Sequence, residues 1–334
     1  MIGEFTENET YKETNMHLME TNPKNQSSVT HFLLLGFSEI HEFQVLLFVV
    51  FVVYYLATFG GNILIMIAVA TDDHLHNPMH FFLMNLAIQD LGQVSVIFPK
   101  SMANSIQDSR QISYAGCVAQ VLFYVFFLTS DFFLLTVMAY DRYVAICNPL
   151  QYEMLMNKQA CLQMIAVVWI GSFLYGILHT GGTFAAPFCS NIINQFFCEL
   201  PQLLKLTCSD LYLIEVGLLL LSAVVEVGCF IFILVTYVHI FIAVLKIPSV
   251  QGRQRAFSTC LPHLLVFSIF VFTVTSVYIK PSYNSPSQLD LAMTILYSML
   301  PPLVNPIIYS LRNKEIKKAI SKILGLRYSP VDSI

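Results

Sequence analysis

Long runs of apolar residues, separated by short polar segments, dominate this 334-residue chain. About 20 apolar residues in a helix are enough to cross the hydrocarbon core of a bilayer. Runs of that length predict helices at about residues 43–70, 77–101, 114–143, 160–186, 211–246, 255–280 and 289–311. The runs lack the alternation typical of a transmembrane β-barrel, and helices satisfy their backbone polar groups internally. The pattern therefore predicts an all-α membrane protein, a seven-transmembrane helix bundle.

Composition supports the same class of protein. Hydrophobic residues make up 56% of the chain, charged residues only 11%, and the mean hydropathy is +0.66. That is more apolar surface than one soluble core could bury, so the excess must face lipid. The net charge of -4 is divided between an acidic N-terminal and a basic C-terminal segment, which gives no indication of nucleic-acid binding.

The first segment, residues 1–42, is polar and lacks the apolar core of a cleavable signal peptide. We therefore expect the first membrane helix to act as the targeting signal. Asn8 and Asn25 each begin a glycosylation sequon. The segment is predicted to be extracellular and glycosylated.

The last segment, residues 312–334, has a different pattern. Its isoleucines Ile316, Ile320 and Ile323 recur at helical spacing, while lysines fill the other face. Such a pattern predicts a short amphipathic C-terminal helix on the membrane surface, followed by a tail.

Orientation follows from the lysines and arginines, which are enriched on the cytoplasmic side of membrane proteins. With the N-terminus outside, eleven of the 17 fall at the cytoplasmic ends of the predicted helices or in the tail. These are Arg142, Lys158, Lys246, Arg253, Arg255, Arg312, Lys314, Lys317, Lys318, Lys322 and Arg327. The charge distribution therefore predicts a multi-pass protein with a cytoplasmic C-terminus.

Four of the eight cysteines, Cys117, Cys189, Cys198 and Cys208, fall on the side predicted to be extracellular, where disulfides form. Four thiols make two bridges, and counting alone leaves three pairings open. The other four cysteines lie in helices or near the cytosol without metal-ligand spacing, so they indicate no metal site.

Acidic residues inside the predicted spans are expensive to bury and therefore informative. Asp90 and Asp131 together favour a bound cation, with two protonated, hydrogen-bonded acids as the alternative. Glu226 is surrounded along the chain by apolar residues, so we expect it to face the bundle. It either belongs to a ligand pocket or, protonated, hydrogen-bonds a neighbouring helix.

Several motifs occur in a fixed order along the chain. They are PMHFFLMNLAIQD (Pro78 to Asp90), MAYDRYVAICNPL (Met138 to Leu150), RAFSTCLPH (Arg255 to His263) and PPLVNPIIYSLRN (Pro301 to Asn313). This set closely resembles that of the olfactory receptors, which are rhodopsin-like G-protein-coupled receptors. The resemblance runs from about Asn25 to Arg327, nearly the whole chain.

The resemblance implies an odorant receptor and no enzyme. Its partners would be a small, mostly apolar volatile odorant, membrane lipid and a heterotrimeric G protein of the stimulatory, olfactory class, which raises cAMP. Its location would be the plasma membrane of cilia on olfactory sensory neurons. The alternative is a non-olfactory rhodopsin-like receptor for another small molecule. Tyr124 stands where aminergic receptors have an aspartate, which argues against the usual binding of a cationic amine.

The resemblance also implies roles for particular residues. For G-protein coupling and switching these are Asp141, Arg142, Tyr143, Tyr237, His263, Asn305, Pro306 and Tyr309. For ligand binding they are Tyr124, Val125, Leu128, Thr129, Ser222, Glu226, Val271, Thr275, Tyr278 and Ser298. It pairs Cys117 with Cys198, which leaves Cys189 with Cys208, and it assigns Asp90 and Asp131 to a sodium site. Sodium would be the sole cofactor.

One departure from the family pattern lies in the sixth predicted helix. Olfactory receptors usually have a tyrosine within an aromatic pair there, and this chain has Val271 between Phe270 and Phe272. Valine has no hydroxyl, so another side chain would have to sense the ligand.

Overall fold

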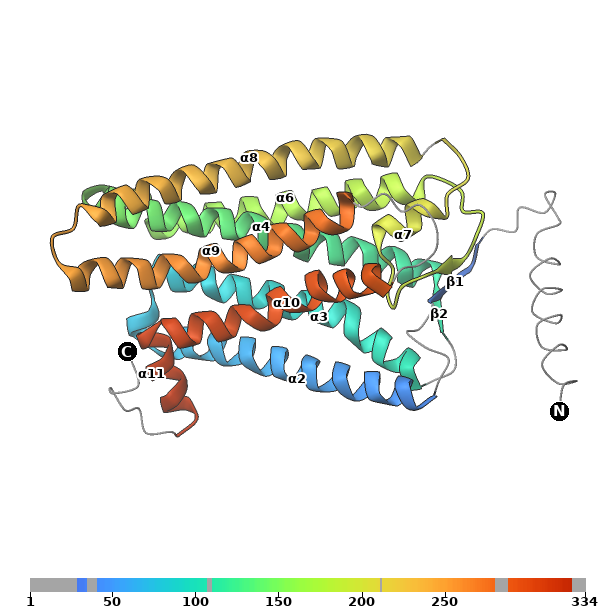
Figure 1. Ribbon diagram of the computed structural model, residues 1–334, viewed down its shortest axis with the longest axis horizontal. Coiled ribbons are helices and arrows are strands. Elements are labelled where there is room, and N and C mark those ends of the chain that lie inside the picture. The colour runs from blue at the N-terminus through green and yellow to red at the C-terminus, as the bar shows by residue number, and fades with distance from the viewer. Residues whose placement is uncertain (1–28, 35–40, 107–109, 211, 280–287, 326–334) are drawn as a thin grey trace, which may run out of the picture. The chain divides into compact units, whose positions relative to one another are not determined.

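The computed structural model describes residues 29–34, 41–106, 110–210, 212–279 and 288–325 (Figure 1). Within these ranges, seven helices of 25 residues or more form a bundle. They are α2 (His41–Thr71), α3 (Pro78–Ile106), α4 (Tyr114–Cys147), α6 (Lys158–Phe184), α8 (Tyr212–Leu245), α9 (Val250–Ile279) and α10 (Gln288–Arg312). Among the described residues, α2, α3, α4, α6 and α8 are each long and apolar enough to cross a membrane. The predicted seven-helix class is confirmed.

The helices differ from the prediction mainly at their ends. The third continues to Cys147 rather than 143, and α9 begins at Val250 rather than 255. Hydropathy marks the part of a helix that is apolar, whereas backbone hydrogen bonding continues into polar residues until a cap or break. Such caps are present: Ser113 Oγ accepts from the Gly116 backbone N–H at 3.1 Å and begins α4.

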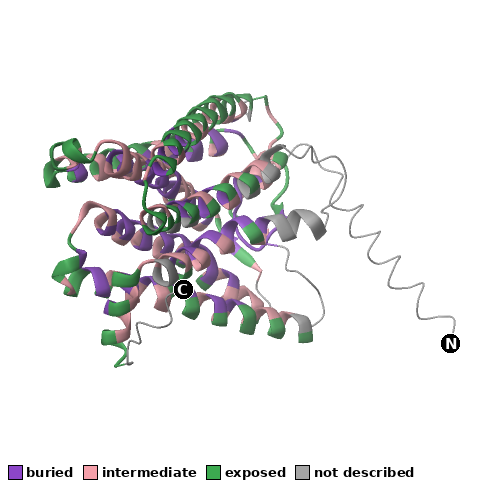
Figure 2. Ribbon diagram, turned by 60° about the vertical axis from the view of Figure 1, so that its left-hand side comes forward, coloured by how far each residue is buried: buried purple, intermediate pink, exposed green. Residues whose placement is uncertain are grey.

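Burial divides the helices into central and peripheral ones. Helices α3 and α4 contribute many of the fully buried side chains, including Phe82, Leu86 and Leu134. Helix α8, uppermost in Figures 1 and 2, is mostly exposed. Its outward residues are apolar, as with Leu221 and Val224, and such a surface is suited to lipid.

A small sheet, which the sequence did not predict, lies at the end of the bundle that carries the disulfides. Strand β1 (His31–Leu34) pairs antiparallel with β2 (Gln111–Ser113) and parallel with β3 (Ile192–Ile193). Phe32 of β1 is fully buried, with its ring 5.3 Å from that of Phe188. Strand β1 has only four residues, HFLL, which is too short for a periodic pattern to distinguish it from the polar segment around it. The sequons at Asn8 and Asn25 lie outside the described residues.

Beyond the bundle, α11 (Lys314–Ile323) leaves α10 at an angle of 93° and packs against α2. Asn313 caps it, because its side-chain oxygen accepts from the backbone N–H groups of Glu315 and Ile316. Ile316 is buried whereas Lys318 is exposed. The predicted amphipathic C-terminal helix is therefore confirmed.

Candidate functional site

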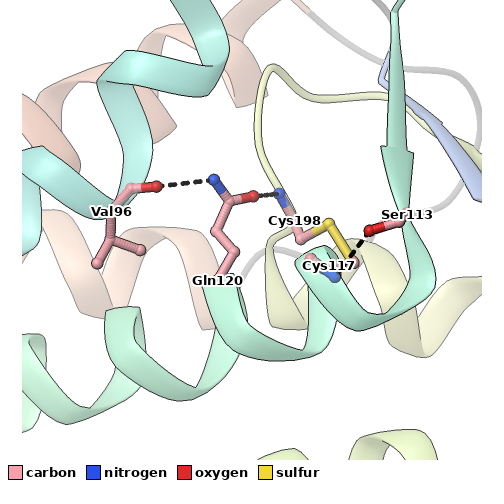
Figure 3. Close-up of a disulfide and its surroundings, with 6 residues drawn as sticks. Val96, Ser113, Cys117, Gln120 and Cys198 are labelled. Carbon is pink, nitrogen blue, oxygen red and sulfur yellow. Dashed lines mark hydrogen bonds between the residues drawn. A yellow bond between two sulfur atoms is a disulfide. The ribbon is translucent and has the colours of Figure 1, made fainter.

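The disulfides are Cys117–Cys198 and Cys189–Cys208, the pairing expected from the family resemblance. Beside the first, the Gln120 amide connects two segments (Figure 3). Its Nε2 donates to the Val96 carbonyl at 3.0 Å, and its Oε1 accepts from the Cys198 backbone N–H at 2.8 Å. The loop between α6 and α8 is thereby held to both α3 and α4.

The same loop is also attached to α10. Glu199 accepts a hydrogen bond from the Tyr297 hydroxyl, and Gln195 Nε2 donates to Thr294 Oγ1 at 3.0 Å. All four side chains are buried. Sequence reasoning missed these contacts, because a polar loop residue gives no indication of which helix it will meet. The loop therefore forms part of the packed structure.

A cavity of about 390 Å³ lies next to this loop, between α4, α6, α8 and α9. Its described wall residues are Val125, Leu128, Thr129, Phe132, Phe133, Tyr175, His179, Leu200, Val216, Leu219, Leu220, Ser222, Ala223, Val225, Glu226 and Phe270. Leu200 belongs to α7 (Leu200–Lys205), in the attached loop. The wall is mostly apolar with a few polar groups, and the volume falls at the low end of small-molecule pockets, which hold roughly 300–1,000 Å³.

The polar groups of the wall form a chain between α6 and α8. His179 Nδ1 contacts Glu215 Oε1, and His179 Nε2 lies 3.1 Å from Ser222 Oγ. The Tyr175 hydroxyl bonds the same Ser222 oxygen at 2.5 Å. His179 is 2% exposed and Glu215 is not exposed at all, so the pair is shielded from solvent.

The protons in this chain can be assigned. Ser222 Oγ donates its one proton to the Leu218 carbonyl at 2.8 Å, so it must accept from both Tyr175 and His179. His179 Nε2 therefore carries a proton. One further proton lies between His179 Nδ1 and Glu215, which makes the pair neutral in total wherever that proton lies. The pair therefore offers the cavity no net charge, although Oε2 of Glu215 has no hydrogen-bond partner among the described residues.

Glu226 differs from Glu215. It lies one helical turn beyond Ser222 on the same face of α8, and it lines the cavity. Among the described wall residues, Oε1 of Glu226 is the one buried polar side-chain atom without a hydrogen-bond partner. An unsatisfied buried acceptor costs about 1–3 kcal/mol, so a ligand that donates a hydrogen bond there would be favoured.

The structure brings together half of the residues proposed to bind ligand. Val125, Leu128, Thr129, Ser222 and Glu226 all line the cavity. Tyr124, Val271, Thr275 and Ser298 are not among its described wall residues, and the side chain of Tyr278 lies outside the described residues.

Contacts elsewhere explain why two of these residues do not line the cavity. The ring of Tyr124 lies 5.2 Å from Phe197 of the attached loop, which occupies the space beside it. The hydroxyl of Ser298 donates to the Thr294 carbonyl of its own helix at 2.7 Å. His179 was not predicted as a wall residue, and the signal for it is a histidine within an otherwise apolar span.

At the opposite end of α4, Asp141 and Arg142 form the pair expected from the family resemblance. Arg142 Nε donates to Asp141 Oδ2 at 3.0 Å, and a second guanidinium nitrogen contacts the same oxygen. The Tyr152 hydroxyl donates to the other oxygen, Oδ1, at 2.8 Å. Burial, and next the Asp141 charge, raise the pKa of Tyr152, so the phenol keeps the proton that it donates.

Tyr152 reaches Asp141 because the chain turns back after α4. That helix ends at Cys147, and Pro149, which cannot donate a backbone hydrogen bond, begins a short 3-10 turn. The helix α5 (Tyr152–Leu155) follows directly. Sequence reasoning stopped at the motif and missed this third member of the cluster. We call the cluster formed by Asp141, Arg142 and Tyr152 the lock.

Two more expected switch residues meet between α8 and α9. The Tyr237 hydroxyl and His263 Nδ1 are 2.8 Å apart, and His263 Nε2 lies 2.9 Å from the Leu135 carbonyl. A carbonyl only accepts, so Nε2 carries the proton and, in the neutral ring, Nδ1 accepts from Tyr237. This pair connects α8 and α9 to α4. Tyr143, also expected to act here, has its ring 6.1 Å from that of His239.

In α10, Asn305 donates from Nδ2 to both oxygens of Asp90, each at 3.1 Å. Asp131 is 2% exposed, and neither of its oxygens has a hydrogen-bond partner among the described residues. Asp131 lies near Asp90. Among the described residues, no group of three or more His, Cys, Asp or Glu could hold a metal. The hydroxyl of Tyr309, which also belongs to α10, is buried.

Comparison with known proteins identifies the family. A family model described as olfactory receptor matches residues 51–327, most of the chain. The chain belongs to the olfactory receptor family. It is 48% identical to human (Homo sapiens) olfactory receptor 14C36, over 90% of this chain and 96% of that protein, and 46% identical to human olfactory receptor 14A16, over 90% and 97%.

The fold of this olfactory receptor is similar to that of squid rhodopsin. The TM-score is 0.71 at 16% identity, covering 89% of this chain and 91% of that one. Within the receptor, the cavity and the lock share helix α4. Thr129 and Arg142 are 13 positions apart, which corresponds to roughly 20 Å along a helix. One continuous helix therefore connects the two sites.

Proposed function

We propose that this olfactory receptor binds a small, mostly apolar volatile molecule in the cavity and thereby activates a stimulatory, olfactory-type G protein that raises cAMP. The observation that carries the proposal is an apolar cavity with one free buried acceptor, on Glu226. The ligand would be an alcohol or amine whose donor meets Glu226 and whose hydrocarbon part contacts Leu128 and Phe270.

The location belongs to the same proposal. The N-terminus and disulfides would face the outside of the plasma membrane, and the lock would face the cytoplasm, in cilia of olfactory sensory neurons. The excess of lysine and arginine near the lock supports this orientation. Membership of the olfactory receptor family argues against a non-olfactory receptor.

The test is a cAMP readout in cells that contain the G protein, with panels of volatile alcohols and amines. Glu226→Gln keeps the size of the side chain and removes its capacity for charge. We expect amines to lose potency much more than alcohols, with surface level retained. The matched control is Glu215→Gln on the same helix, which disturbs the His179 pair and should lower surface level. Unchanged potency of every agonist in Glu226→Gln would contradict a ligand role for Glu226.

Coupling is tested at the lock. Arg142→Ala should leave surface display largely intact and abolish agonist-driven cAMP, because the arginine is the group that the G protein would meet once Asp141 releases it. An agonist response equal to that of the parent would remove Arg142 from the coupling role.

A sodium ion between Asp90 and Asp131 is also proposed. The unpartnered oxygens of Asp131 fit a hard cation, which prefers oxygen ligands. Replacing sodium by choline should shift agonist potency in the parent but not in Asp131→Asn. Equal sodium dependence in both would refute the site.

A further inference from the structure

The wall of the cavity includes residues on the outer surface of the bundle. Leu220 of α8 lines the cavity and is 66% exposed, and Ala223 beside it is exposed as well. On a membrane helix, an exposed apolar side chain faces the hydrocarbon of the lipid. The cavity therefore reaches the lipid-facing surface of the receptor.

Leu220 and Ala223 belong to a row of wall residues along one flank of α8. Val216, Leu219, Leu220 and Ala223 are spaced i, i+3, i+4 and i+7, so they share one side of the helix. Phe230 continues this flank seven residues after Ala223. Its ring stacks on Phe267 of α9, with 6.0 Å between the ring centroids. The flank therefore faces the seam between α8 and α9.

That seam is closed towards the lock. Below the Phe230–Phe267 stack, Tyr237 hydrogen-bonds His263, and the rings of Phe241 and Phe257 stack at 5.6 Å. These contacts tie α8 to α9 over the half of the bundle nearer the lock.

Two other sides of the cavity are bridged. Between α6 and α8, the hydrogen bonds of Tyr175 and His179 cross the interface. On the side of the disulfides, the attached loop contributes Leu200 to the wall, and this loop is held by Cys117–Cys198. At Leu220, by contrast, the wall is an exposed apolar side chain, so a molecule dissolved in the lipid meets the cavity wall directly at this flank.

We propose that ligands enter the cavity from the hydrocarbon of the membrane, between α8 and α9 at Leu220. This inference rests on the proposed function and narrows the ligand class to molecules that partition into lipid before they bind. Such a molecule concentrates in the bilayer and meets an apolar wall without crossing the attached loop. Its donor group then reaches Glu226, which lies six residues further along α8.

The test measures access to the cavity without any ligand. Thr129→Cys places a thiol in the cavity wall on α4, in full-length receptor reconstituted in lipid vesicles. The probe is an uncharged pyrene maleimide dissolved in the bilayer, compared with a charged methanethiosulfonate in the water. The parent receptor gives the background from its own cysteines. We expect the bilayer reagent to label Cys at this position faster than the charged one.

The entrance itself is then changed. Leu220→Trp should slow labelling by the bilayer reagent roughly tenfold, equivalent to about 1.4 kcal/mol in barrier height. Leu220→Ala should accelerate it. The control is Leu221→Trp, on a neighbouring residue that is 62% exposed and is not a described wall residue, and it should leave the rate unchanged. If Thr129→Cys fails to fold, Leu128→Cys offers a second thiol in the same wall.

Two results would overturn the proposal. One is equal labelling rates in Leu220→Trp and Leu221→Trp. The other is a slow rate only in Val225→Trp, because Val225 is a wall residue on the opposite flank that is 45% exposed. Neither result depends on Glu226. The proposed entrance can therefore be refuted while the ligand role of Glu226 stands, and the ligand role can be refuted while the entrance stands.

Discussion

Asn62 of α2 donates from Nδ2 to the carbonyl oxygen of Pro302 in α10 at 3.1 Å. Pro306, four residues later, has no backbone N–H, so this carbonyl lacks its usual helical donor. A similar relationship occurs one turn earlier, where Pro302 leaves the Ser298 carbonyl free and Gln93 Nε2 approaches it at 3.4 Å. Two side-chain amides from neighbouring helices thus satisfy the carbonyls that two prolines release.

The first prediction concerns this substitution of a side-chain donor for a backbone donor. Asn62→Ala leaves the Pro302 carbonyl buried and unsatisfied, which should cost about 1–3 kcal/mol of stability. The measurement is thermal unfolding of purified receptor. In a Pro306→Ala background the backbone N–H returns, so Asn62→Ala should cost much less there. Equal costs in the two backgrounds would show that Asn62 stabilises the bundle in some other way.

The sequence predicted those parts of the structure that depend on local pattern or on the family motifs. The helices followed from apolar runs, and the disulfide pairing and the Asp141–Arg142 pair followed from the resemblance. Contacts between distant polar residues did not follow. Glu215 was one of two acids in its span, and nothing along the chain indicates that His179, 36 positions earlier, will neutralise it. Such pairing depends on how α6 rotates and packs against α8.

The second prediction concerns the close approach of those two helices at Gly182. A Cβ added at Gly182 would overlap Oε2 of Glu215 and lie 3.2 Å from Leu218 Cδ1. Gly182→Ala should therefore force apart α6 and α8, at a cost of about 1–3 kcal/mol, as overpacking typically does. Receptor at the cell surface and its thermal stability are the measurements.

The matched control lies next to it. A Cβ at Gly181 would meet nothing within 4 Å. Gly181→Ala should thus be neutral or should stabilise α6 by roughly 0.5–1 kcal/mol, because alanine loses less conformational freedom in a helix. A similar loss of surface receptor in both variants would point to the glycine pair itself and not to the fit of Glu215.

The third prediction concerns Tyr152 in the lock. Tyr152→Phe removes one hydrogen bond to a charged carboxylate, and such bonds contribute about 1.5–3 kcal/mol. Arg142 should then be freed more easily, so cAMP without agonist should rise while surface level is kept. The control is Tyr140→Phe, which removes a hydroxyl from α4 without touching Asp141. If basal cAMP does not rise above that of the control, Tyr152 does not restrain the lock.

The last prediction uses the two hydrogen bonds of Gln120 (Figure 3). Glutamine donates to the Val96 carbonyl and accepts from the Cys198 backbone N–H, so it satisfies two buried backbone groups at once. Ionised glutamate keeps the acceptor but loses the donor, and methionine of similar length keeps neither. Stability should therefore fall in the order parent, Gln120→Glu, Gln120→Met, if each backbone group left unsatisfied costs about 1–3 kcal/mol.

Thermal unfolding and the amount of receptor at the cell surface measure that order. The disulfide Cys117–Cys198 remains in all three proteins, so any difference reports the amide and not the covalent link. Because the loop also supplies Leu200 to the cavity wall, the methionine variant should weaken agonist potency along with stability. A methionine variant more stable than the glutamate variant would mean that burying the glutamate charge outweighs the hydrogen bond it keeps, and that Gln120 acts through its neutrality rather than through its two contacts.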